Sequence, residues 1–175
     1  MKFIYIISFF FISFYSRFLF ADNIAVINIQ YLIENNDQYK TLFEEFQRSQ
    51  EKYFKNFEIE EIDLKLIFDE IEESKLILSE NEINIKIDNY NKQLNNFTIK
   101  VENFNLHFEN QIENNREIVL KEIIELLEKY AIENNIDLII DANSYLIASN
   151  KIDITENIYN VLKEINLQLE FKDFE

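Results

Sequence analysis

The chain contains no glycine and no proline in its 175 residues, whereas average usage predicts about 12 glycines and about 9 prolines. The abundance of asparagine, isoleucine, phenylalanine and lysine indicates a coding sequence poor in G and C, but the fold must still form without both residues. Sandwiches and barrels built on tight turns depend on them, whereas helix interiors exclude them. Glycine-rich phosphate loops and dinucleotide-binding fingerprints are excluded as well. Long helices are therefore the first prediction.

Charge and the rare residue types exclude further functions. Lysine and arginine total 17 against 33 aspartates and glutamates, a net charge of −16, which argues against a nucleic-acid binder because such proteins neutralise phosphates. The chain has no cysteine, which excludes disulfides, thiol nucleophiles and zinc–thiolate sites. His107 is the single histidine, which disfavours a histidine-dependent triad or a multi-histidine metal centre. We expect no enzyme activity, no catalytic residues, no metal, no cofactor and no small-molecule substrate.

The N-terminal segment has the pattern of an export signal. Lys2 precedes an apolar run over residues 3–15, and Arg17 interrupts this run before it reaches the length of roughly 18 residues that a membrane span needs. Ala21 offers a small residue at a cleavage position. We predict a signal peptide over residues 1–21, cleaved after Ala21, with an uncleaved N-terminal anchor as the alternative. In either case the rest of the chain is exported.

Two series of mostly apolar residues follow with alternating steps of three and four, the 3.5-residue period of a coiled-coil seam. The first comprises Phe43, Phe46, Gln50, Tyr53, Phe57, Glu60, Leu64, Ile67, Ile71, Ser74 and Leu78. The second comprises Ile83, Ile87, Tyr90, Leu94, Phe97, Val101, Phe104, Phe108, Gln111, Asn115, Ile118 and Glu122. Beyond Phe108 the apolar phase drifts to Ile112, Val119, Ile123, Leu126 and Leu127. The drift predicts that the second helix contacts a different partner there.

A helix boundary separates the two series. Ser79 and Glu82 have the spacing of a capping box, so one helix should end near Leu78 and the next should begin at Ser79. Two seams of similar length joined at one break predict an antiparallel helical hairpin. We predict a coiled-coil arm over residues 39–117, with its tip near residues 78–82.

The segments that flank the arm, residues 22–38 and 118–175, are predicted to form a β-rich body. Short apolar runs predict strands at residues 24–27, 136–140 and 145–148. Asp141 and Asn143 are suited to a turn without glycine, and Asp153 is suited to cap a helix.

Such a body needs partners. Three short strands bury little surface, and a small sheet leaves unpaired edges. The predicted fold class is therefore α+β, with a long antiparallel coiled-coil hairpin that projects from a small β-barrel or β-sheet body completed by oligomerisation. The expected oligomerisation residues are Ile24, Val26, Ile27, Leu138, Ile139, Ile140, Leu146 and Ile147.

These segments together form a specific pattern. After the signal peptide come IAVINIQ at residues 24–30, a heptad hairpin with a Leu-Ser-Glu tip, and IDLIIDAN at residues 136–143 with Asp-Ile-Thr at 153–155. Over essentially the whole mature chain, this pattern resembles the Skp/OmpH family of periplasmic chaperones. The resemblance implies a homotrimer with a β-barrel body, whose three hairpins surround a cavity that holds unfolded outer-membrane β-barrel proteins without ATP. It also implies a periplasmic location.

Most phenylalanines of the mature chain lie in the hairpin and are the candidate client-binding residues. They are Phe43, Phe46, Phe54, Phe57, Phe68, Phe97, Phe104 and Phe108. A two-helix hairpin has one seam to fill, so Phe54 and Phe68, which are next to seam positions, should widen the apolar stripe beyond it. An exposed stripe would bind unfolded clients weakly and at many points. The alternative is that all eight rings form the hairpin core.

The charge of the arm departs from the better-known members of that family, which are basic. Residues 58–73 are dominated by acidic side chains, with Lys65 as the one base. We interpret this run as a solvated outer helix face. It disfavours attraction to anionic lipid, so membrane contact is left open.

Two other functions stay open. A secreted structural coiled coil, such as a spacer or an envelope-tethering protein, fits the heptads and the acidity but leaves the strand-rich ends unexplained. An exported enzyme or small-molecule binder would need a constellation of side chains in the compact end, and the sequence offers none. Binding of an unfolded client distinguishes a chaperone from both.

Overall fold

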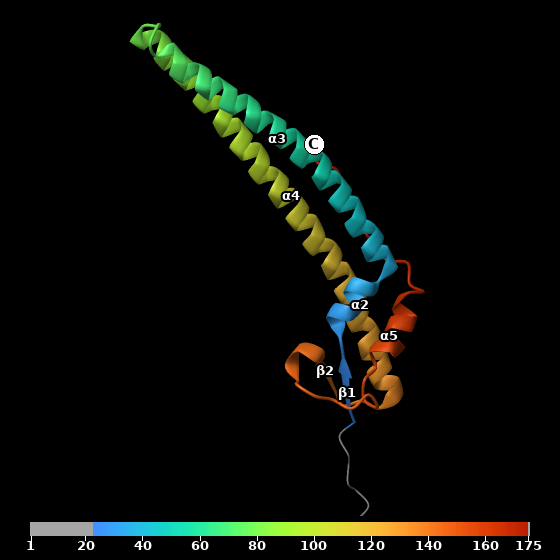
Figure 1. Cartoon of the computed structure of the whole chain (residues 1–175). Helices are drawn as coiled ribbons and strands as arrows, with labels where there is room; N and C mark the ends of the chain where they lie inside the picture. The colour runs from blue at the N-terminus through green and yellow to red at the C-terminus, as the bar shows by residue number, and fades with distance from the viewer. Residues whose placement is uncertain (1–22, 175) are drawn as a thin grey trace, which may run out of the picture.

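The structure is a computed structural model that describes residues 23–174; the predicted signal peptide, residues 1–21, lies outside them. Two long helices, α3 (Asp37–Ser74) and α4 (Glu80–Asn134), run antiparallel and side by side, and form an arm that projects from a small body (Figure 1). At 1.5 Å per residue they are about 57 Å and about 83 Å long. The predicted helical hairpin is confirmed.

The tip of the arm is a turn over residues 75–78. Helix α3 ends at Ser74, four residues before the predicted end, because the chain turns where the Ile77 N–H donates to the Ser74 carbonyl (3.0 Å). The capping box predicted at Ser79 is present, and the Glu82 carboxylate accepts hydrogen bonds from the Ser79 hydroxyl (2.6 Å) and N–H (3.0 Å). These two bonds hold the pKa of Glu82 below its usual value.

In the body, strand β1 (Ile24–Ile27) lies between two parallel neighbours. On one side it pairs over its whole length with β2 (Leu138–Asp141). On the other side the Val26 N–H donates to the Ile152 carbonyl (2.8 Å), and the Val26 carbonyl accepts from the Ile154 N–H (3.0 Å). The first two predicted strands are therefore present, although β2 begins two residues later than predicted.

The third predicted strand, residues 145–148, is wrong for the single chain. These residues follow a short 3-10 helix, η1 (Ala142–Ser144), and form no strand; Leu146 and Ile147 are 101% and 91% exposed. A strand needs a neighbour to pair with, and the second edge of β1 pairs instead with residues 152–154. Within residues 23–174 the chain forms an open two-stranded sheet, so the single chain closes no barrel.

The core of the body lies where the sheet, α2 (Ile29–Asn35), α5 (Thr155–Leu162) and the end of α4 meet (Figure 1). Its buried side chains are Ala25, Ile27, Leu32, Ile33, Val119, Ile123, Ile154, Ile158, Leu162 and Leu167. Val119 and Ile123 of α4 are completely buried there. The predicted change of partner beyond Phe108 is confirmed, because the apolar face of α4 turns from α3 to the body.

Asparagine occupies several helix ends in this chain without glycine. Asn135 ends α4 in the left-handed conformation (φ 53°, ψ 44°), which asparagine tolerates better than most residues. Asn28 and Asn36 cap α2 and α3, and their side-chain oxygens accept from N–H groups three residues later (2.9 and 3.0 Å). The predicted N-cap at Asp153 is off by one residue, since Ile154 is the N-cap of α5. The Asp153 carboxylate accepts from the Thr155 N–H at 2.9 Å.

Candidate functional site

Four of the candidate phenylalanines form the core of the arm in the half nearer the body. Phe46, Phe57, Phe104 and Phe108 are buried. The centroid of the Phe104 ring lies 4.8 Å from that of Phe108 and 5.1 Å from that of Phe57, and the Phe104 and Phe57 rings meet nearly at right angles. Edge-on contacts of this kind add to the free energy of burial. These rings hold α3 and α4 together.

The remaining candidate phenylalanines reach solvent. Phe43, Phe54 and Phe68 are exposed by 41%, 54% and 44%, and Phe97 is half-buried. Large aliphatic side chains are also exposed on both helices and at the tip, including positions on the outer faces of the helices. They are Ile59, Ile62, Leu66, Leu76, Ile77, Ile85, Leu94, Ile99 and Leu106. The arm therefore exposes large apolar groups from its root to its tip.

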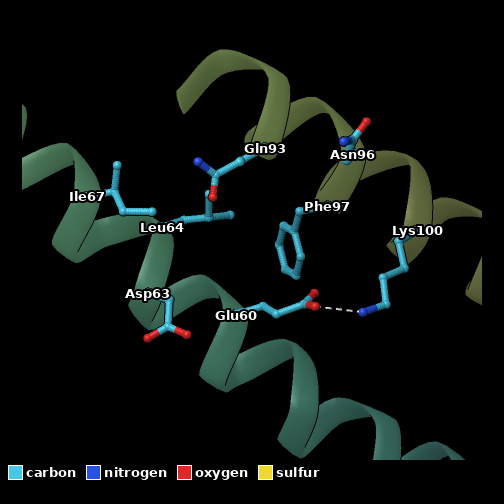
Figure 2. A pocket seen from close by; sticks show the side chains of 8 residues that line it. All are labelled: Glu60, Asp63, Leu64, Ile67, Gln93, Asn96, Phe97 and Lys100. Carbon is cyan, nitrogen blue, oxygen red and sulfur yellow. Dashed lines mark hydrogen bonds and ion pairs between the residues drawn. The ribbon is translucent and has the colours of Figure 1, made fainter. Parts of the chain in front are cut away.

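A cavity of about 300 Å³ interrupts the seam in the middle of the arm, where a heptad position holds Glu60. Figure 2 shows Glu60 extending from α3 toward Lys100 of α4, with the Phe97 ring beside the pair. The carboxylate and ammonium are 2.7 Å apart, and both side chains are partly exposed. A pair this exposed contributes little to stability. The middle of the arm is consequently less well packed than the aromatic cluster in the half nearer the body.

Replacing Glu60 by leucine should stabilise the arm. Leucine would fill part of the cavity, and burial of its side chain would stabilise the arm by about 1.5 kcal/mol. This gain exceeds the contribution of a partly exposed ion pair. We expect the melting temperature to rise by about 2–4 °C, measured by circular dichroism. The control Glu61→Leu changes an exposed neighbour and should leave the melting temperature unchanged. A lower melting temperature for Glu60→Leu would mean that the ion pair, and not packing, stabilises this part of the arm.

The acidic run, residues 58–73, is solvated apart from its seam positions. Its acidic side chains are exposed except for the partly buried Glu60. Glu70 pairs with Lys86 of α4 at 2.7 Å, and the hydrogen bond from that ammonium holds the pKa of Glu70 below its usual value.

The C-terminal segment, residues 165–174, here called the tail, lies along the root of the arm. Three amide side chains of the arm each bind the backbone of the tail through both their oxygen and their nitrogen. These pairs are Gln38 with the Leu167 N–H and the Ile165 carbonyl (3.0 and 2.6 Å), Asn115 with the N–H and carbonyl of Glu170 (2.9 Å each), and Gln111 with the N–H and carbonyl of Lys172 (2.7 and 2.8 Å). The backbone of the tail is thus bound at three points along its length.

Alternate side chains of the tail pack on the aromatic cluster of the arm. Leu167 is buried in the body core, and Leu169 and Phe171 pack against the rings of the arm. The Phe171 centroid is 5.4 Å from that of Phe46, and the Phe174 centroid is 5.5 Å from that of Phe104. The sequence prediction places this segment in the body and does not include its contact with the arm. The apolar alternation from Leu167 to Phe171 was the signal that predicts an extended segment with one buried face.

Polar contacts fix the far end of the tail. The Ser49 hydroxyl donates to the Asp173 carboxylate at 2.5 Å, and the Tyr53 hydroxyl donates to the Phe174 carbonyl. The Ser49 bond holds the pKa of Asp173 below its usual value. Nε2 of His107 lies 2.9 Å from the Lys172 carbonyl oxygen.

The predicted oligomerisation residues divide into two sets. Val26 and Ile27 are buried inside the single chain, and Ile139 and Ile140 are partly buried. The exposed set consists of Ile24, Leu138, Leu146 and Ile147. Ile24 and Leu138 lie opposite each other at one end of the sheet, and the other two follow β2 in the loop after η1.

The turn predicted at Asp141 is present. Its carboxylate accepts from the Ile29 N–H (3.2 Å) and from the Asn143 side chain (2.9 Å). Burial raises the pKa of Asp141, but these hydrogen bonds outweigh that effect and hold the pKa below its usual value.

Among residues 23–174, histidine and acidic side chains form no group that could hold a metal ion. No helix in that part of the chain has the length and apolar character of a membrane span.

Comparison with known proteins agrees with this architecture. A family model described as "Outer membrane protein (OmpH-like)" matches residues 23–162. The chain belongs to the OmpH-like family. The resemblance found from the sequence is thereby confirmed. No curated protein matches the sequence.

A solved structure shares the OmpH-like fold. It is the crystal structure of a candidate outer membrane chaperone (OmpH-like) from Caulobacter crescentus, with a TM-score of 0.71 and 11% sequence identity. The match covers 87% of this chain and 90% of that chain. At this identity the similarity shows the fold alone.

The OmpH-like match includes the sheet, the arm and α5, and it ends at residue 162. The tail therefore lies beyond the part of the chain that the family model matches. The surface on which it lies, formed by α3 and α4, is within that part.

Proposed function

We propose that this OmpH-like protein is an ATP-independent periplasmic holdase chaperone, which binds unfolded outer-membrane β-barrel proteins in a cavity between the arms of a homotrimer. Membership of the family and the arm-and-body fold support the proposal. A holdase requires no nucleotide and no metal, because it only competes with the self-association of its client.

The observation that carries the proposal is the apolar surface along the arm. Large apolar side chains are exposed on both helices, from Phe43 near the root to Ile77 at the tip. Soluble proteins rarely expose extended apolar surface unless it binds something. Each contact is weak, since burial contributes about 25 cal/mol per Å², but several contacts with one client add up. Strands of membrane barrels alternate apolar and polar residues, so an extended client has one apolar face to offer.

The open sheet supports assembly of the body into a trimer. Within the described residues β2 pairs on one side only, and an unpaired strand edge invites pairing with another chain. The exposed Leu138 lies in that strand, and the exposed Leu146 and Ile147 lie in the loop after η1. Neighbouring subunits would cover these side chains, and three arms would then enclose one cavity.

Aggregation of an unfolded porin tests the function. We expect that residues 22–175, at one trimer per porin, suppress most of the light scattering that follows dilution of the porin from urea. Lysozyme at the same mass is the inert control. A structural spacer would leave the scattering unchanged, and so would any protein without exposed client-binding surface. Unchanged scattering at a severalfold excess of trimer would contradict the proposal.

A further inference from the structure

The contacts between the tail and the arm point to a second kind of client contact. We propose that the groove between α3 and α4 at the root of the arm binds one extended client segment with alternating apolar side chains, and that the tail occupies this groove as a tethered competitor. The inference rests on the proposed holdase function and adds a defined site to it.

Three amide side chains of the groove bind the backbone of an extended segment. Gln38, Asn115 and Gln111 each contact a backbone N–H and a backbone carbonyl of the tail, at 2.6–3.0 Å. An amide side chain supplies one acceptor and two donors, so each amide copies the pairing that a neighbouring strand would give. Any segment without proline at these positions offers the same groups. Recognition of this kind parallels the addition of a strand to a sheet edge.

The floor of the groove selects apolar side chains at alternate positions. Phe46, Phe104 and Phe108 are buried, and Leu169 and Phe171, two residues apart in the tail, pack against their cluster. Phe174 adds a further ring three residues later. The tail residues between the inward-facing ones are exposed. A strand of an outer-membrane barrel has this alternation, with apolar residues on the lipid face and polar residues on the other. The groove therefore suits the chemistry of such a strand.

The tail closes the groove from within the same chain. It follows α5 directly and lies beyond the region that the OmpH-like family model matches, whereas the groove lies inside that region. A tethered segment acts at an effective concentration near the millimolar range. A client must compete with it, so loosening the tail should strengthen client binding.

Two matched double variants of the full chain test the proposal. Leu169→Ser with Phe171→Ser removes inward side chains and should release the tail, and hydrogen exchange at the Glu170 amide reports the release. Asn166→Ser with Gln168→Ser changes exposed residues of the same tail and should leave it bound. The probe is a fluorescent peptide of residues 164–174, measured by anisotropy. We expect it to bind the released variant at least about tenfold more tightly than the control variant.

A third substitution and a competitor complete the test. Asn115→Leu, added to the released variant, should weaken peptide binding about tenfold, because the two hydrogen bonds between Asn115 and the backbone of Glu170 are lost, while helicity measured by circular dichroism is retained. An unlabelled peptide copied from a porin strand should displace the probe. Absence of probe binding to the released variant, or binding unaffected by Asn115→Leu, would overturn the groove as a peptide site. Failure of the porin peptide to displace the probe would overturn it as a client site. If the probe bound but neither the wild-type chain nor any variant suppressed porin aggregation, the proposed holdase function would be rejected, whereas the groove would be kept as a peptide-binding site.

Discussion

Replacing Leu146 and Ile147 by aspartate should dissociate the proposed trimer and reduce the mass in solution to that of one chain. Both side chains are almost fully exposed in the single chain, in the loop that follows the one-sided strand β2. Covering a leucine or isoleucine contributes about 1.5–3 kcal/mol per side chain, and burying an unpaired carboxylate instead costs several kcal/mol. Each of the three interfaces would carry this change, so the trimer should dissociate.

The arm tip supplies a matched control for this prediction. Leu76 and Ile77 are also adjacent, and they are 91% and 85% exposed, but they lie at the far end of the arm. Their replacement by aspartate adds the same charge and should leave the trimer intact. Light scattering coupled to size exclusion measures the mass, and circular dichroism confirms that both variants are folded. A trimeric L146D/I147D variant would show that assembly uses another surface.

The arm was predictable from the sequence because its determinants are local. The heptad spacing fixes which side of each helix faces the other, and the box formed by Ser79 and Glu82 fixes where α4 begins. The drift of apolar residues beyond Phe108 correctly indicated a new partner for α4, since Val119 and Ile123 are buried in the body.

The rest depended on contacts between distant segments. Residues 145–148 have the composition of a strand, but strand formation depends on a neighbour, and β1 pairs with residues 152–154 instead. Phe43 occupies a seam position and is still exposed, because it lines an open hollow at the root beside Tyr39 and Arg116. The heptads alone cannot predict where a hairpin opens to admit other segments.

Replacing Phe54 and Phe68 by serine should weaken client binding by about tenfold or more in the proposed trimer, because six exposed rings would be lost from the proposed cavity and their contacts would act together. Each ring touches one aromatic neighbour, Phe104 at 5.5 Å and Tyr90 at 5.6 Å between centroids. About half of each side chain nevertheless faces solvent. Helicity and trimer mass should therefore change little. Titration of a fluorescently labelled unfolded porin measures the affinity.

Substitutions at neighbouring polar positions serve as the control, because they distinguish the loss of apolar surface from a general effect of substitution. Lys55→Ser with Asp69→Ser changes two exposed side chains beside the same rings and keeps the net charge, so client affinity should stay the same. Phe57→Ala, inside the seam, should instead cost about 3–5 kcal/mol of stability. If F54S/F68S behaved like Phe57→Ala and melted much earlier, the two rings would belong to the hairpin core. Client binding would then depend on the aliphatic side chains of the arm or on the groove at its root.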